Sequence, residues 1–121
     1  MSKKSFTVII SKKIKNYNKK KIVDFDKSIS IRSFLIGSIS QGISEFKNIL
    51  ESEDVFSTIS CLKNLGVKII KKKKGNYLVY GKGLGSLKIK KNKILNCGNS
   101  GTLARLLIGI MSTNPKIKVK L

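Results

Sequence analysis

Uncharged stretches with helical spacing stand out in a chain of which 26% of the residues are charged. Residues 33–44 contain no charged side chain, and the hydrophobic residues in and just before the first part of this stretch recur at helical intervals. These residues are Ile31, Phe34, Leu35 and Ile39. A second helix is predicted for residues 102–112, where no charge follows Arg105. Both patterns predict helices that are buried on most sides, and the N-terminal end of the helix at residues 102–112 is expected to be the part open to chemistry.

A third helix is predicted between these two. Gly42 is expected to end the first helix, and residues 45–50 alternate in polarity as a strand does. Ser52 is a candidate N-cap for the next helix, and Gly66 is expected to end it. One face of this helix would be hydrophobic, at Val55, Ile59, Leu62 and Leu65.

The other elements are predicted to be strands and turns. Residues 67–70 and 77–80 indicate a hairpin, and the lysine-rich residues 71–76 between them indicate a charged turn or a solvated edge. Residues 81–86 are expected to form a glycine-rich turn. Further strands are predicted at residues 5–10, 21–25, 88–96 and 117–121, with a polar connector at residues 12–21.

The predicted order of elements is βαβαββ, followed by the start of another αβ unit. This order indicates an α/β (α+β) fold, because helices alternate with strands along most of the chain. A length of 121 residues suits one domain or part of one. Since no closing helix or polar tail follows residues 117–121, we expect this sequence to be the N-terminal part of a longer protein.

Composition narrows the possible chemistry. Two cysteines, Cys61 and Cys97, do not form a disulfide framework, and Cys97 is expected to be a packed free thiol. The sequence has no histidine, which excludes Cys–His nucleophile pairs and histidine-ligated metals within it. No signal peptide or membrane-spanning pattern is recognisable, so a cytoplasmic setting is expected.

The formal net charge of +20 suggests a nucleic-acid-binding module as one hypothesis. The lysines are spread along the whole chain and occur with many Ile and Asn residues, however, as codon bias in an AT-rich genome would produce. Aromatic residues are also sparse, at 7%. These features disfavour direct binding of nucleic acid but leave it open.

Two short polar segments indicate a site for an anion. Residues 27–32 and 98–105 combine small, hydroxyl and amide side chains at the predicted start of a helix. The first turn of a helix offers free N–H groups and the positive end of the helix dipole. Arg32 and Arg105 are the only arginines among 26 basic residues, and both lie in these segments. Because guanidinium binds carboxylate or phosphate in a bidentate manner, a phosphorylated ligand is predicted rather than two ordinary surface ion pairs.

The same segments resemble the signatures of one enzyme family. Residues 26–32, Asp-Lys-Ser-Ile-Ser-Ile-Arg, are similar to its D-K-S-[IV]-S-H-R motif. Residues 50–55 resemble its L-x-S-x-D-[VT] stretch, residues 65–67 its L-G-V turn, and residues 98–105 its G-N-[AS]-G-T-x-x-R motif. In order and spacing, residues 21–111 thus resemble the 5-enolpyruvylshikimate-3-phosphate synthase family.

The resemblance implies a two-lobed fold of repeated βαβαββ units, an inside-out α/β barrel. Residues 1–20 would belong to the lobe completed by the C-terminal half, and residues 21–121 would form an incomplete other lobe. The implied reaction transfers the enolpyruvyl group of phosphoenolpyruvate to the 5-hydroxyl of shikimate 3-phosphate and releases phosphate, without a metal or other cofactor. The expected partners are these two substrates, with no nucleic acid and no membrane, and a monomer is expected at full length.

Three residues of the first segment take roles in binding shikimate 3-phosphate by this resemblance. Lys27 would contact both substrates and neutralise charge at the reacting centre, as the catalytic residue of this part of the chain. Ser28 and Arg32 would hold the shikimate carboxylate. Their separation by four residues places them on one helix face, which agrees with a shared ligand.

The second segment takes the corresponding roles toward phosphoenolpyruvate. Gly101 would bring backbone N–H groups against this substrate. The loop around it would be shaped by Asn99, Thr102 and Arg105. Gly101 and Arg105 are again four residues apart.

The chain also departs from the family pattern. Ile31 replaces the usual histidine, and Asp24 and Phe25 replace a Pro-Gly pair. The family's acid/base residues lie beyond position 121, so the chain alone is expected to be inactive. Two further hypotheses remain: a non-catalytic phosphate-binding remnant, and a related transferase acting on UDP-N-acetylglucosamine. The latter family has G-x-K-N-A where this chain has Lys27 and Ser28.

Overall fold

A computed structural model describes residues 25–89 and 94–121. It contains three helices and three strands among these residues. In chain order they are α1 (Lys27–Ile39), β1 (Gln41–Phe46), α2 (Glu53–Asn64), β2 (Lys68–Lys73), β3 (Asn76–Lys82) and α3 (Gly101–Met111). The mixed α/β class predicted from the sequence is confirmed.

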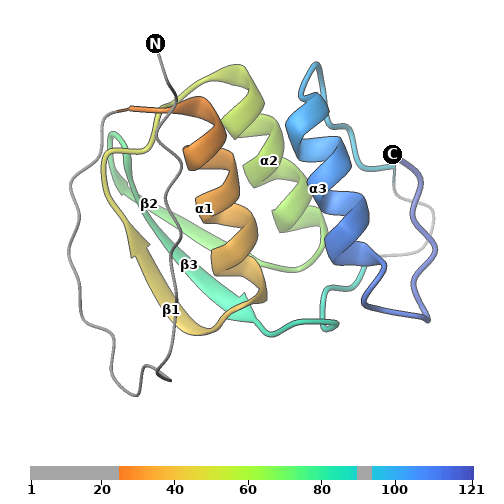
Figure 1. Ribbon diagram of the computed structural model, residues 1–121. Helices are drawn as coiled ribbons and strands as arrows, with labels where there is room; N and C mark the ends of the chain where they lie inside the picture. The colour runs from red at the N-terminus through yellow and green to blue at the C-terminus, as the bar shows by residue number, and fades with distance from the viewer. Residues whose placement is uncertain (1–24, 90–93) are drawn as a thin grey trace, which may run out of the picture.

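The strands form an antiparallel sheet in the order β1-β3-β2. β3 is therefore central, with Val79 paired to Ser44 of β1 and to Ile69 of β2. All three helices lie on the same side of this sheet (Figure 1). The structure thus has two layers, one of strands and one of helices.

The helices also run in the same direction. α1 contacts both α2 and α3, and the N-terminal ends of all three lie at one end of the molecule (Figure 1). This arrangement gathers three sets of first-turn N–H groups and the positive ends of three helix dipoles.

The core lies between the helices and the sheet. Phe34 of α1 is fully buried and meets Phe46 and Tyr77 edge to face, with ring centroids 6.1 and 5.2 Å away. Further fully buried side chains come from α1, α2, β3 and α3, namely Ile31, Val55, Leu62, Val79, Leu103 and Leu107. Burial of such side chains contributes roughly 1.5–3 kcal/mol each, which fixes the helices on the sheet.

The end of the first helix and the start of the first strand differ from the prediction. α1 stops at Ser40, whose carbonyl accepts a hydrogen bond of 3.0 Å from the N–H of Gly83. Gly42 does not end the helix; it lies inside β1 with φ of +88°, opposite Gly81. Residues 47–50 are not a strand, since Asn48 adopts a left-handed φ of 60°. Pairing with β3 thus determines these boundaries, and local alternation does not show it.

The two helices that contain long uncharged stretches are less buried than predicted. Ile29 and Ile36 of α1 are 48% and 61% exposed, and Ile108 of α3 is 57% exposed. Buried positions of α3 are Leu103, Leu107 and Met111. In the described residues each helix therefore has one buried stripe and one exposed side, on which apolar side chains accompany Arg32 in α1 and Arg105 in α3.

Several other predictions can be compared directly. The Ser52 N-cap position, the hydrophobic face of α2 and the hairpin of β2 and β3 are confirmed, although Ser52 makes no capping hydrogen bond through its side chain. The strands predicted at residues 88–96 and 117–121 are wrong for the described part of these ranges, where only a single bridge joins Ile94 to Lys120. The strands predicted at residues 5–10 and 21–25 and the connector at 12–21 lie outside the described residues, apart from Phe25, which is in no strand.

Candidate functional site

The site is built at the shared N-terminal end of the helices, beginning with α1. Asp26 is the N-cap, and its Oδ1 accepts a 2.7 Å hydrogen bond from the N–H of Ile29. The backbone carbonyl of Asp26 accepts from the N–H of Ser30 at 2.9 Å. These bonds fix the start of the helix, whose first turn has Lys27 exposed and Ser28 half-buried.

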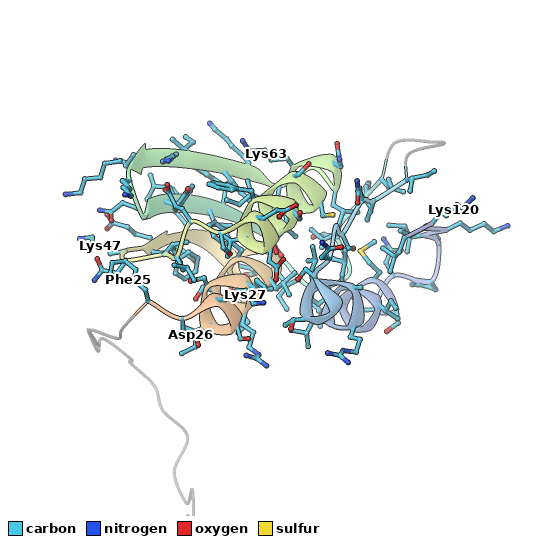
Figure 2. The ribbon with its side chains drawn as sticks, turned by 90° about the horizontal axis from the view of Figure 1, so that it is seen from above. Phe25, Asp26, Lys27, Lys47, Lys63 and Lys120 are labelled. Atoms are coloured by element: carbon cyan, nitrogen blue, oxygen red, sulfur yellow. The ribbon has the colours of Figure 1, made fainter. Side chains whose placement is uncertain are left out.

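Lys27 is held by a carboxylate from the neighbouring helix. Its Nζ lies 2.9 Å from Oδ2 of Asp54, in the first turn of α2. The hydrogen bond to Asp54, with its charge, raises the pKa of Lys27 above 10.5, and the charge of Asp26 adds to this effect. The lysine side chain remains 51% exposed. Figure 2 looks onto this end of the molecule and shows Asp26 and Lys27 at the start of α1. Lys27 is therefore a protonated and accessible cation of defined position.

Ser28 and Arg32 lie on the outer part of the same helix. Ser28 is half-buried and Arg32 is exposed, and neither side chain has a hydrogen-bond or ion-pair partner within the described residues. The hydroxyls of Ser30 and Ser33 instead donate to helix carbonyls, at 2.7 and 2.9 Å. Of the serines in the first two turns of α1, Ser28 therefore has the hydroxyl that is free for a ligand.

The start of α3 is organised by a serine and a glycine. Ser100 is the buried N-cap, and its Oγ accepts from the N–H of Leu103 at 3.2 Å. Gly98 precedes it with φ of +56°, a conformation that strains other residues. A Cβ on Gly98 would also lie only 2.9 Å from Oγ of Ser57 in α2. The glycine thus allows the loop to pass directly against α2.

The second arginine reaches back over the start of α3. A Cβ built on Gly101 would lie 3.8 Å from a terminal guanidinium nitrogen of Arg105. Arg105 is exposed, and it makes no ion pair with any residue that the structure describes. Within the described residues, neither Arg32 nor Arg105 thus forms an ordinary ion pair on a helix surface.

The hydrogen bonds at the start of α3 show which backbone N–H groups there are already used. The N–H of Gly101 donates to the carbonyl of Asn99 at 3.2 Å, and that of Leu103 to Ser100. Thr102 has the first-turn N–H for which no acceptor exists among the residues described. Gly101 and Asn99 are exposed and Thr102 is half-buried. The open amide at this helix start therefore belongs to Thr102, and Gly101 keeps the approach to it clear.

Sequence reasoning missed Asp54 as a member of this site. The sequence showed it only as an acidic residue in the first turn of a helix and as part of the stretch at residues 50–55. Its pairing with Lys27 joins residues 27 positions apart and depends on how α1 packs on α2. The available signal was an acidic helix start in a chain with only six acidic residues.

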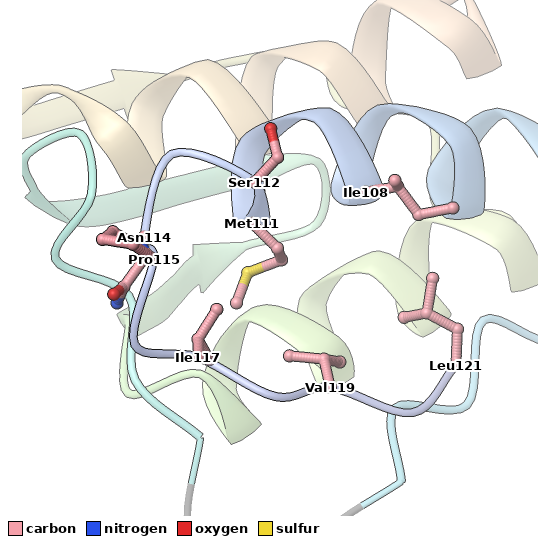
Figure 3. A pocket seen from close by; sticks show the side chains of 8 residues that line it. All are labelled: Ile108, Met111, Ser112, Asn114, Pro115, Ile117, Val119 and Leu121. Carbon is pink, nitrogen blue, oxygen red and sulfur yellow. The ribbon is translucent and has the colours of Figure 1, made fainter.

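The described residues also form a pocket, which lies away from the two helix starts. A pocket of about 370 Å³ is lined by residues of the C-terminal half of α3 and the segment after it, among them Ile108, Met111, Ile117 and Leu121 (Figure 3). It is at the opposite end of α3 from Gly101 and is mainly apolar. Within residues 25–89 and 94–121, no three His, Cys, Asp or Glu side chains are grouped as metal ligands would be. No described helix has the length and hydrophobicity to span a membrane.

Comparison with known proteins identifies the relatives of this chain. The family model of EPSP synthase (3-phosphoshikimate 1-carboxyvinyltransferase) matches residues 12–121. The 3-phosphoshikimate 1-carboxyvinyltransferase of Thermoanaerobacter pseudethanolicus is 55% identical over 87 residues, which cover 72% of this chain and 20% of that protein. The enzyme of the same name from Oenococcus oeni is 45% identical over 102 residues, or 84% of this chain and 23% of that protein.

A solved structure agrees with these relatives. EPSP synthase from Acinetobacter baumannii superposes with a TM-score of 0.67 and 39% sequence identity, covering 74% of this chain and 20% of that one. The chain thus spans about a fifth of the length of the proteins it matches. The match to nearly the whole chain, together with the shared fold, shows that this chain belongs to the EPSP synthase family.

Proposed function

We propose that this chain forms part of an enzyme that transfers the enolpyruvyl group of phosphoenolpyruvate to shikimate 3-phosphate. The 5-hydroxyl oxygen of shikimate 3-phosphate adds to the enol carbon while the adjacent carbon gains a proton. The tetrahedral intermediate then loses phosphate and a proton from its methyl group, which re-forms the double bond and gives the enol ether product. Chorismate and aromatic amino acid biosynthesis would use the product.

One observation carries this proposal. The only two arginines of the chain are both exposed, both lack ion-pair partners among the described residues, and both lie near the N-terminal ends of parallel helices that contact each other. Shikimate 3-phosphate and phosphoenolpyruvate each carry a carboxylate and a phosphate. Guanidinium forks, free first-turn amides and one lysine form a set of groups that suits such anions.

The proposed roles are those that the family resemblance implies, and the exposure of the side chains and their lack of partners support them. Ser28 and Arg32 bind the shikimate carboxylate, and Lys27 contacts both substrates and offsets the charge that develops as the hydroxyl adds. At the second helix start, the open amide of Thr102 and the guanidinium of Arg105 bind phosphoenolpyruvate.

Other members of that helix start support the binding of phosphoenolpyruvate. Gly101 leaves room for the substrate, and Asn99 fixes the loop through its carbonyl. In this proposal the lysine-rich surface has no nucleic-acid partner, and the complete enzyme acts as a cytoplasmic monomer without a metal or cofactor.

The identity of the acceptor substrate is tested by a direct assay. The protein at the full length of its coding sequence is supplied with phosphoenolpyruvate and either shikimate 3-phosphate or UDP-N-acetylglucosamine, and released phosphate and product mass are measured. We expect product with shikimate 3-phosphate alone. Product from UDP-N-acetylglucosamine, or none from either acceptor, would refute the proposal. We expect no product from residues 1–121 alone, because four of the five described carboxylates are already engaged: Asp26 caps α1, and Glu45, Glu51 and Asp54 pair with lysines. Only Glu53 makes no ion pair with the described residues, so no second free carboxylate is present among them for acid/base work.

A further inference from the structure

One face of α2 connects the two helix starts that form the candidate site. Asp54, Ser57 and Cys61 are spaced at i, i+3 and i+7, so they lie on one side of this helix. Asp54 pairs with Lys27 at the start of α1. Ser57 lies against Gly98, and the thiol of Cys61 donates to the carbonyl of Asn96 at 3.3 Å. A helix outside the two motifs therefore contacts both.

The buried side of α2 and the Cys61 hydrogen bond hold this helix in place. Burial raises the pKa of the Cys61 thiol to about 12, so the thiol stays protonated and can donate. Val55 and Leu62, on the buried side of α2, are fully inaccessible and anchor the helix in the core. The carboxylate of Asp54 is itself 18% exposed and is carried on this fixed helix. Asp54 is thus placed by packing, whereas Lys27 has a long and flexible stem.

The ion pair has little value for stability. Exposed pairs in which one partner is as open to water as Lys27 contribute little, because water screens them and the lysine loses rotamer freedom. A carboxylate beside the proposed anion site also repels anionic substrates, which is a cost to their binding. The carboxylate at this place is therefore better explained by its effect on where the ammonium group lies.

We propose that Asp54 is a positioning residue that holds the ammonium group of Lys27 toward the reacting centre. This inference rests on the proposed function. Asp54 acts through Lys27 and does not touch the substrates. Its loss leaves the ammonium present but mobile, and misplacement of a catalytic group by about 1 Å costs up to about a hundredfold in rate.

The test compares variants of the protein at the full length of its coding sequence. Asp54→Asn keeps the shape and removes the charge, and Asp54→Glu restores the charge. Glu53→Gln is the matched control: Glu53 is the adjacent residue in the first turn of α2, is exposed, and makes no ion pair with the described residues. The kcat, the KM for both substrates, the pH profile of kcat and the Tm are measured for each variant.

For Asp54→Asn we expect kcat to fall by about tenfold to a hundredfold, with KM changed by less than about threefold. The alkaline limb of its pH profile should move to lower pH, because Lys27 loses the carboxylate that raises its pKa. Asp54→Glu should recover most of kcat, and Glu53→Gln should match the wild type.

Three results would overturn the inference. The first is an Asp54→Asn enzyme with the kcat and pH profile of the Glu53→Gln enzyme. The second is a fall in kcat together with Tm but without movement of the alkaline limb, which would indicate a purely structural role. The third applies if Asp54→Asn does not fold: an NMR titration of wild-type Lys27 that gives a pKa at or below 10.5 would then contradict the pairing, and a higher value would support it. An inactive wild type would instead refute the proposed function.

Discussion

Individual hydroxyl, amide and guanidinium groups differ in what they do, although the sequence presents them as similar. Ser30 donates its hydroxyl to the Asp26 carbonyl and accepts from the N–H of Leu50 at 3.0 Å, so it ties α1 to the loop before α2. Ser28 makes no such bond within the described residues. The serines of one segment therefore divide into structural and available groups, and only the three-dimensional arrangement distinguishes them.

Arg32 provides the sharpest residue-level prediction for ligand binding. Arg32→Lys should weaken binding of shikimate 3-phosphate by about 1–3 kcal/mol, because lysine keeps the charge but cannot form a bidentate pair with a carboxylate. Isothermal titration calorimetry without phosphoenolpyruvate measures this effect. Arg105→Lys is the matched control, since Arg105 is assigned to the other substrate. Equal affinities of wild type and Arg32→Lys would remove Arg32 from the site.

Glu51 provides a prediction for stability rather than ligand binding. Its carboxylate accepts from the N–H of Gly75 at 2.9 Å, from Nζ of Lys71 at 3.0 Å and from the hydroxyl of Tyr77 at 2.7 Å. These donors, the Gly75 N–H first, lower the pKa of Glu51 from 4.5 to about 2. Glu51→Gln should therefore lower the free energy of unfolding by about 1–3 kcal/mol at neutral pH.

The pH dependence follows from the direction of this shift. Because the pKa is lower in the folded state, the stabilisation is complete above pH 4.5 and is lost as the pH falls toward 2. Denaturant unfolding at several pH values should show a smaller loss of stability over this range for Glu51→Gln than for the wild type. Glu45→Gln, at an exposed pair 3.7 Å from Lys47, is the control and should change stability by less than about 1 kcal/mol. Parallel pH curves for wild type and Glu51→Gln would contradict this assignment.

At the scale of helices and strands, the sequence predicts those elements whose ends are set by neighbouring turn or cap residues. The β2–β3 hairpin and α2, with its Ser52 N-cap and the Gly66 stop, are predictable because turn and cap residues lie beside them. The end of α1 is not, because it depends on Gly81 of β3 and on Gly83 just after that strand, both far from Ser40 along the chain. The pairing of Lys27 with Asp54 could not be predicted either, because it depends on how two helices pack. The two helix starts that carry arginines could be predicted from the sequence.

The contact of α1 with β3 can be tested at a single glycine. A Cβ on Gly81 would overlap the carbonyl of Ser40 and lie 2.6 Å from the carbonyl oxygen of Gly37. Gly81→Ala should therefore push α1 away from the sheet and destabilise the fold by about 1–3 kcal/mol.

The control for this substitution is Gly109→Ala in α3, where a Cβ would meet nothing within 4 Å. It should stabilise the fold by about 0.5–1 kcal/mol, since alanine favours a helix over glycine. Thermal unfolding measures both changes. A Tm for Gly81→Ala equal to or above that of the wild type would contradict the close approach of α1 and β3.

At the scale of the whole molecule, one end carries the candidate chemistry, and one strand face is open to solvent. The helices cover the inner face of the sheet, Ile43 of β1 is 61% exposed, and exposed lysines lie on β2 at the opposite edge, across β3. The net charge of +20 is therefore spread over surfaces that are remote from the helix starts as well as near them. Charge alone does not identify the function of this chain, whereas the convergence of α1, α2 and α3 at one end gives a specific site to test.

The most direct test of that site is a crystal structure of the protein, at the full length of its coding sequence, with shikimate 3-phosphate bound. We expect electron density for the shikimate carboxylate within hydrogen-bonding distance of Ser28 Oγ and the Arg32 guanidinium, with Lys27 Nζ beside the 5-hydroxyl. Density for the ligand at any other place, with Ser28 and Arg32 still facing solvent, would contradict it.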